Sequence, residues 1–223
     1  TTEIYTLSLH DALPIFTDTI PRSRISGSPF DFVFAIRTID DLKNSPLKDS
    51  DPKVYNVLIK AIKAGYTLYA EVRVYSYYFK VCGTIDVFAV RGQEFVIIDW
   101  KTNKDELKFY SGYYKKAWNA NRTEKVKTKE WVSKDERFSY PLNTLQVCKG
   151  NIYTLQLSLY AALAERWGYV CKGLILCHLL GVRNPDKETK IYGNIKYLKH
   201  EVHNLLEHQL ERKKAKNKRR VIR

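Results

Sequence analysis

Methionine is absent from the 223 residues, and the chain begins at Thr1. We therefore expect it to be a piece of a longer protein. Residues 1–16 also lack the basic start and the small-residue cleavage site of a signal peptide. They resemble translated sequencing-adapter sequence, so we expect this stretch to be non-native and give it no part in the functional argument.

Long hydrophobic runs are absent too. No apolar segment approaches the roughly 18 residues that a membrane-spanning helix needs, so we expect no membrane partner. Hydrophobic residues nevertheless make up 44% of the chain, which is enough for a buried core. The cysteines form no C-x-x-C pair and show no zinc-site spacing, which favours reduced thiols. They are Cys82, Cys148, Cys171 and Cys177.

Acidic residues are scarce beside basic ones. The chain has 24 Asp and Glu against 38 Lys and Arg, a formal net charge of +14. Such an excess favours a polyanionic partner, most often nucleic acid. An anionic membrane surface, or no specific partner at all, is also compatible with the charge alone.

What the sequence does contain is a set of strands around a glycine turn. Alternating β-branched and aromatic residues predict strands over 66–78, 82–90 and 94–100. Gly92 suits a tight turn between the second and third strands, so the three are expected to form an antiparallel meander. Apolar residues at helical spacing predict a helix over 51–64, directly before the meander.

The second half of the chain is less regular at first. Residues 103–150 are expected to form a long excursion that is partly helical. An apolar stripe then predicts a helix over 151–167, followed by a buried strand over 169–180. A further strand is expected at 190–197 and a last helix at 198–210.

These elements predict an α/β fold in which a mixed sheet with an antiparallel meander is flanked by helices. The domain is expected to cover 17–210, with the excursion inside it. Residues 211–223 form a basic tail that either grips phosphates, acts as a localisation signal or is a solvated, disordered end. Aromatic and basic residues mix at 109–118, which suits either stacking on unpaired bases or packing in the core.

The meander carries a cluster of charged side chains. Asp99 and Lys101 are two residues apart on one strand, so they share a face, and Asp86 lies on the neighbouring strand. Two carboxylates about 4 Å apart repel by roughly 4 kcal/mol at an effective dielectric of about 20. Lys101 and a bound Mg²⁺ would offset this repulsion, and Glu71 on the next strand is the natural third acid.

Soft metal ligands are expected to lie elsewhere. The histidines after the meander are far downstream in the sequence, which argues against zinc. They are His178, His200, His203 and His208. A D-x-K strand end is also common as a plain polar terminus, so Asp99 and Lys101 by themselves are weak indicators of catalysis.

Taken in order, the residues carry a resemblance to a known family. They are Glu71, GTID at 83–86, IIDWKT at 97–102, and Gln156 with Tyr160 four residues later. This order resembles that of the PD-(D/E)XK nuclease superfamily, in particular its RecB-like and Cas4-like branch, which includes many phage exonucleases. The resemblance covers about residues 66–180 and implies a restriction-endonuclease-like core.

The resemblance implies a role for each residue of the pattern. The catalytic residues would be Glu71, Asp86, Asp99 and Lys101. The metal, Mg²⁺ or Mn²⁺, would be held by Asp86, Asp99, Glu71 and the backbone carbonyl of Trp100. The substrate would be contacted by Gln156, Tyr160, Arg73 and Thr102. For Gln156 and Tyr160, packing against the sheet is an equally good interpretation, because i, i+4 pairs are often buried neighbours.

The sequence also departs from the family pattern. Ile85 stands where the family name has proline. Members of this branch usually carry a histidine in an N-terminal helix, whereas the histidine upstream of Glu71 is His10, inside the adapter-like stretch. The cysteines are not placed as in the Cas4-like proteins that hold an iron–sulfur cluster, so no iron–sulfur cluster is expected.

The expected function is therefore metal-dependent hydrolysis of DNA phosphodiester bonds in recombination, repair or replication, by an exonuclease more than by a restriction-type enzyme. Its partners would be single-stranded DNA or duplex ends, together with a helicase or recombinase, in the cytoplasm of a bacterial or phage-infected cell. Two alternatives stay open. One is a non-catalytic nucleic-acid-binding module with a nuclease fold, and the other is an RNA-processing nuclease of the same fold.

Overall fold

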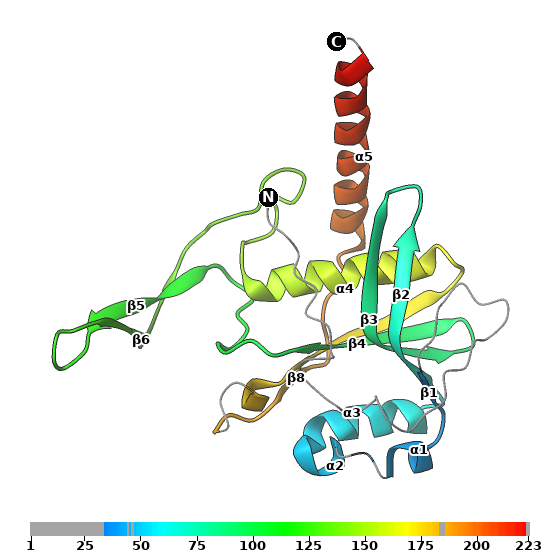
Figure 1. Ribbon diagram of the computed structural model, residues 1–223, viewed down its shortest axis with the longest axis horizontal. Coiled ribbons are helices and arrows are strands. Elements are labelled where there is room, and N and C mark those ends of the chain that lie inside the picture. The colour runs from blue at the N-terminus through cyan, green and yellow to red at the C-terminus, as the bar shows by residue number, and fades with distance from the viewer. Residues whose placement is uncertain (1–33, 44, 46, 183–185, 222–223) are drawn as a thin grey trace. The chain divides into compact units, whose positions relative to one another are not determined.

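A computed structural model describes residues 34–43, 45, 47–182 and 186–221 (Figure 1). The adapter-like stretch and His10 lie outside these residues. The described chain forms two compact units. The first contains 34–106 and 157–199, and the second contains 107–156 and 200–221.

The first unit is built on a six-stranded sheet with the strand order β1-β2-β3-β4-β7-β8. β4 and β7 run parallel, and the other neighbouring pairs are antiparallel. The strands are β1 (Phe34–Ile36), β2 (Thr67–Ser76), β3 (Val81–Arg91), β4 (Glu94–Lys101), β7 (Val170–His178) and β8 (Lys190–Tyr192). The predicted meander is confirmed as β2-β3-β4, and β8 is shorter than the strand expected there.

Helices accompany this sheet (Figure 1). They are α1 (Ile39–Lys43), α2 (Leu47–Ser50), α3 (Pro52–Lys63), α4 (Lys149–Glu165), the short η3 (Leu180–Val182) and α5 (Lys199–Val221). α4 begins in the second unit and ends in the first. The prediction of an α/β fold with a mixed sheet flanked by helices is confirmed, and the three longer predicted helices are present as α3, α4 and α5.

The start and the end of α3 follow from its sequence. Asp51 precedes the helix, and its Oδ1 accepts a hydrogen bond of 3.1 Å from the N–H of Val54. Pro52 occupies the first turn, where a missing N–H leaves no hydrogen bond unmade. Gly65 follows the helix with a φ of 85°, the left-handed conformation that often ends helices. These signals place the helix directly before β2.

α3 covers one face of the sheet (Figure 1). Val54 and Leu58 of the helix are buried in one hydrophobic cluster with Leu68, Ala89 and Ile98 of the strands. A fully buried Leu or Ile side chain contributes about 1.5–3 kcal/mol relative to an exposed one. This layer is therefore a main source of stability for the first unit.

β3 changes the side to which its residues point. Val87 belongs to the cluster beneath α3. A Cβ atom at Gly83, however, would lie 2.3 Å from Cε1 of Tyr160 on α4. Residues four apart on a regular strand share a face, so the pleat is interrupted between them. Opposite this point on β2, Glu71 has a backbone φ of 53°, in the left-handed region that non-glycine residues seldom adopt.

The second unit contains a hairpin where partly helical structure was expected. β5 (Gly112–Trp118) and β6 (Lys125–Ser133) form a two-stranded antiparallel sheet. Asn119 closes the loop between them, since its Oδ1 accepts a 2.9 Å hydrogen bond from the N–H of Thr123. The prediction of helix in this excursion is wrong because residues 125–129 alternate lysine with Val or Thr, which is the period of a strand, and β5 pairs with this strand.

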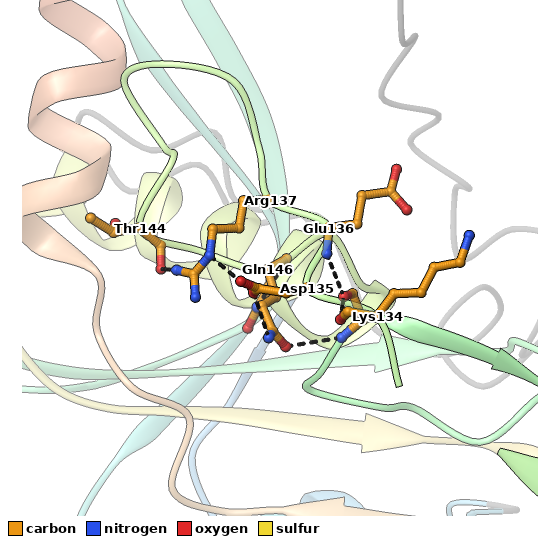
Figure 2. Close-up of polar contacts among 8 residues, drawn as sticks. Lys134, Asp135, Glu136, Arg137, Thr144 and Gln146 are labelled. Atoms are coloured by element: carbon orange, nitrogen blue, oxygen red, sulfur yellow. Dashed lines mark hydrogen bonds and ion pairs between the residues drawn. The ribbon is translucent and has the colours of Figure 1, made fainter. Parts of the chain in front are cut away.

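Figure 2 shows polar contacts that hold the segment after β6 against the segment before α4. Gln146 Nε2 donates to Oδ1 of Asp135 at 3.1 Å, and Arg137 Nε lies 3.0 Å from the same oxygen. Arg137 Nη1 also donates to the carbonyl of Thr144 at 3.1 Å. Oε1 of Gln146 accepts a hydrogen bond of 3.1 Å from the N–H of Ser111, a buried residue that directly precedes β5. The base of the hairpin is thus tied to its own unit.

α5 continues the predicted last helix through most of the basic tail, as far as Val221. Basic residues dominate its second half, which therefore has no continuous apolar stripe. Within the part of the chain that the structure describes, no helix combines the length and the apolar character needed to cross a membrane.

We expect Gly83→Ala to destabilise the protein. The new Cβ would fall within 2.3 Å of the Tyr160 ring, which is buried and cannot move away freely. Overpacking of this kind costs about 1–3 kcal/mol. Urea unfolding followed by circular dichroism should therefore show a free energy of unfolding lower by about that amount.

Gly193→Ala is the matched control, because no atom lies within 4 Å of a Cβ built at Gly193. It should leave the free energy of unfolding nearly unchanged. Adding Tyr160→Ala to Gly83→Ala should cost less than the two separate effects summed, because the ring is then gone. Equal stability of the Gly83 and Gly193 variants would contradict the contact between strand and helix.

Candidate active site

Strand pairing places three acids in one row across the sheet. The register of β2 and β3, which is continuous on either side, puts Glu71 opposite Asp86. One step beyond the pair Val87–Ile98, Asp86 in turn lies opposite Asp99 on β4. Residues directly opposite each other on antiparallel strands have Cβ atoms about 4.5–5.5 Å apart. The three acids that the sequence singled out are therefore neighbours on adjacent strands.

β3 and β4 part at this row. Their backbone pairing ends at Val87–Ile98. Beyond it, a backbone N–H of β4 is bonded to a side chain of β3 instead of to a backbone carbonyl. The N–H of Trp100 donates to Oδ2 of Asp86 at 2.8 Å. Lys101 Nζ lies 2.5 Å from Oδ2 of Asp99. An ammonium group and a backbone N–H thus each contact one of the two facing carboxylates.

The charges of this cluster shift one another's pKa. Burial raises the pKa of Asp86 well above its ordinary range, and the negative charge of Asp99 raises it further. Burial also raises the pKa of Asp99, although Lys101 acts in the opposite direction. For Lys101, burial by itself would lower the pKa, but Asp99 and Asp86 outweigh it and the pKa is raised. Lys101 is therefore a firmly protonated cation beside two acids that resist ionisation.

The acids and the lysine of the cluster are largely buried. The side chain of Asp99 is 2% exposed and that of Lys101 is 13% exposed. As whole residues, Asp86 and Glu71 have an intermediate exposure, although Oε1 of Glu71 is buried. The cluster therefore lies in surroundings of low dielectric, which strengthen its electrostatic interactions.

The four residues expected to contact substrate are placed differently from one another. Tyr160 is buried on α4, in the first unit, and lies close enough to Lys101 to raise its pKa. Thr102 directly follows β4 and is partly buried, whereas Arg73 is exposed on β2. Gln156 lies one helical turn before Tyr160 on α4, in the part of that helix that belongs to the second unit. The structure thus brings Tyr160 close to Lys101, while Thr102 adjoins the cluster in the chain.

Carboxylate oxygens are the donors that hard divalent cations prefer. Among the described residues, no group of three or more His, Cys, Asp or Glu side chains is arranged to hold a metal ion. Asp86 and Asp99 nevertheless fit such an ion chemically, because burial and the charge of Asp99 disfavour the ionised form of Asp86, and added positive charge would relieve this. The donor chemistry suits Mg²⁺ or Mn²⁺.

His178 is a neighbour of the cluster that the sequence argument missed. It ends β7, which runs parallel to β4, and it pairs in register with Lys101. His178 is therefore close to the cluster in space although it is remote from it in sequence, and its ring contacts Asn103 rather than the acids. Its Nε2 lies 2.9 Å from the carbonyl oxygen of Asn103 and so carries the ring proton, while burial lowers the pKa and keeps the ring neutral. The only signal in the sequence is that His178 ends a second buried strand, as Lys101 ends β4.

We expect Asp86→Asn to stabilise the metal-free protein at neutral pH. Because the pKa of Asp86 is raised in the folded state, folding favours its protonated form and the ionised form is costly. This cost is absent below the ordinary Asp pKa of about 3.9 and appears as the pH rises through the raised pKa. In EDTA, the free energy of unfolding at neutral pH should be higher in the variant by on the order of 1 kcal/mol.

The gain should disappear when the same urea titration is run below about pH 4, where both proteins are neutral at this position. Asp49→Asn, which changes an exposed acid of the same unit, should alter stability at neither pH. A variant that is less stable than the native chain at neutral pH would mean that Asp86 is a net stabilising anion, contrary to the geometry described.

The comparisons with known proteins identify no relative. No protein-family model matches the chain, and neither a curated protein nor a solved structure is significantly similar to it. The function must therefore be inferred from the residues and contacts of the chain itself.

Proposed function

We propose that the chain is a Mg²⁺- or Mn²⁺-dependent nuclease that hydrolyses DNA phosphodiester bonds, acting as an exonuclease in recombination, repair or replication. The observation that carries the proposal is the cluster of Asp86, Asp99 and Lys101 at the end of β4. Ligand sites of open α/β sheets typically lie at the carboxyl ends of parallel strands. β4 and β7 end together at Lys101 and His178, which is where this cluster lies.

A restriction-endonuclease-like core is part of the same proposal. It is supported by an acid on each strand of the β2-β3-β4 meander and by the D-x-K order of Asp99 and Lys101. It is also supported by α4, which follows the meander in the chain and presents Tyr160 to the first unit. These features match the PD-(D/E)XK resemblance drawn from the sequence.

Each residue of the cluster has a role in the proposed reaction. Asp86, Asp99 and the carbonyl of Trp100 would hold the metal, with Glu71 assisting. The bound metal would supply Lewis-acid chemistry at the phosphate and a lower pKa for water. Lys101, whose raised pKa keeps it cationic, stabilises the negative charge that develops on the phosphate oxygens. Burial of Asp99 strengthens these electrostatic interactions, because the surrounding dielectric is low.

The charge of the chain supports a DNA substrate. A net charge of +14 attracts phosphates and makes binding strongly dependent on salt. Single strands or duplex ends are the substrates that an exonuclease would need, and a helicase or recombinase would supply them. The proposed setting is the cytoplasm of a bacterial or phage-infected cell.

A non-catalytic DNA-binding module is the second candidate. It is favoured by the ion pair between Lys101 and Asp99, because that pair engages a carboxylate oxygen that a catalytic metal would need. Such a protein would bind DNA in the absence of metal, with an affinity that depends strongly on salt, and would not cleave it. An RNA-processing enzyme of the same fold differs from the proposal in substrate alone.

We expect Asp99→Asn and Lys101→Gln each to reduce Mg²⁺- or Mn²⁺-dependent DNA cleavage by about 10²–10⁴-fold, because each removes a charge at the reacting phosphate. The measurement is release of labelled nucleotides from linear single-stranded and duplex DNA, compared with RNA of the same sequence. Closed circular DNA should resist an exonuclease. EDTA should stop cleavage.

Two surface substitutions of the same unit serve as controls. Lys172→Gln removes a lysine that pairs with Glu94 at 3.0 Å on the exposed side of β7, and Asp49→Asn removes an exposed acid. Both should cleave like the native chain, and circular dichroism should report a native fold for all four variants. Cleavage that persists in both site variants would contradict the proposed mechanism. If the native chain binds DNA without cleaving it, the second candidate is the correct one.

A further inference from the structure

One face of the β5–β6 hairpin carries aromatic and basic side chains in three cross-strand pairs, with a shift of register between the first pair and the second. The pairs are Tyr114–Trp131, Lys116–Lys127 and Trp118–Lys125. The rings of Tyr114 and Trp131 meet edge to face with centroids 4.9 Å apart. Lys125 Nζ lies 5.3 Å from the ring centroid of Trp118. We call this surface the ribbon face, and its three pairs contain no acid.

The opposite face of the hairpin is different. Lys115 lies there and forms an ion pair with Glu130, with Nζ 2.5 Å from Oε1. The neighbouring pair, Ala117 opposite Val126, carries no charge. The positive charge of the hairpin is therefore concentrated on the ribbon face, while the other face is close to neutral along β5.

The ribbon face brings lysines together beside an exposed aromatic ring. Lys116 and Lys127 lie directly opposite each other across the two strands. Trp118, two residues after Lys116, is 56% exposed. A polyanion bound along this face would meet both lysines and would cover the exposed ring.

The base of the hairpin is built to hold the ribbon face in place. Trp131 packs edge to face against Tyr110, with ring centroids 5.5 Å apart, as well as against Tyr114. A Cβ at Gly112 would lie 2.6 Å from the Trp131 ring, so only glycine lets the ring lie flat against β5. The contacts of Figure 2 fix the adjoining segments. The face is thus preorganised, which lowers the entropic cost of binding.

We propose that the ribbon face binds single-stranded nucleic acid, with bases stacking on Trp118 and phosphates meeting Lys116, Lys125 and Lys127. Alternation of aromatic and basic side chains along a strand is what a single strand requires, because its bases and phosphates also alternate. The inference adds a binding surface to the proposed nuclease and does not depend on cleavage.

Other occupants fit this face less well. A duplex keeps its bases stacked on one another, so it offers no base plane to an exposed indole ring. A membrane surface would require a continuous apolar stripe, whereas lysines interrupt the aromatic residues of this face. Lysines also protect exposed sheet edges from aggregation. Protection of the edges, however, does not require an exposed Trp118. It also does not require the lysines to be concentrated on one face of the hairpin.

The test is fluorescence anisotropy with a labelled oligothymidylate, using the whole chain in EDTA at low salt. Trp118→Ala should weaken binding by about five- to 100-fold, since one stacked base is worth about 1–3 kcal/mol. Trp118→Phe should restore most of the affinity because it keeps a ring. Lys116→Gln and Lys127→Gln should each lower the slope of log affinity against log salt by about 0.7.

Lys115→Gln is the matched control, because it removes the same charge from the same strand but from the opposite face. It should change affinity less than twofold. Equal losses in Lys115→Gln and Lys116→Gln would overturn the proposal, and so would native affinity in Trp118→Ala or tighter binding of duplex than of single strand.

The outcome is separable from that of the cleavage assay. Asp49→Asn should bind the oligonucleotide like the native chain, because Asp49 is an exposed acid of the first unit and the hairpin belongs to the second. If the chain never cleaves DNA, the ribbon face can still be tested in full. If the hairpin variants bind normally, the proposed nuclease stands unaffected.

Discussion

The placement of two acids and one lysine inside a sheet is the constraint on which the rest of the first unit depends. Buried carboxylates are tolerated only when hydrogen bonds and opposite charge meet them. Here the β3–β4 ladder ends at Ile98, three residues before the end of β4, and the N–H of Trp100 donates to Asp86 instead. Lys101 meets Asp99 from the same strand. Glu71, whose backbone is strained, lies at the same level of the sheet as these charges.

This combination is informative because it costs stability. A strand residue with a φ of 53° and two facing acids with raised pKa values are features that a purely structural sheet has no reason to contain. In the proposed nuclease, a bound divalent cation would relieve the cost of ionising Asp86, and Lys101 would meet the negative charge of the phosphate.

The parts of the fold that depend on short stretches of sequence were predicted correctly. The period-two alternation over β2, β3 and β4 and the helical spacing of apolar residues in α3 are visible in the sequence, and both elements are present. The strained backbone of Glu71 is not visible, because nothing in the residue type of Glu71 indicates a left-handed conformation. The hairpin was missed for a related reason. Its strands are exposed on both faces, so they lack the apolar stripe by which a strand is recognised.

The candidate site shows that contacts between segments far apart in the sequence are harder to predict than contacts between neighbouring strands. Antiparallel neighbours joined by a short turn are predictable, so Asp86 and Asp99 were correctly expected to face each other. Parallel pairing of β4 with β7 joins segments separated by the whole excursion and α4, and no local pattern specifies it. His178 was therefore assigned to a remote region although it ends beside Lys101.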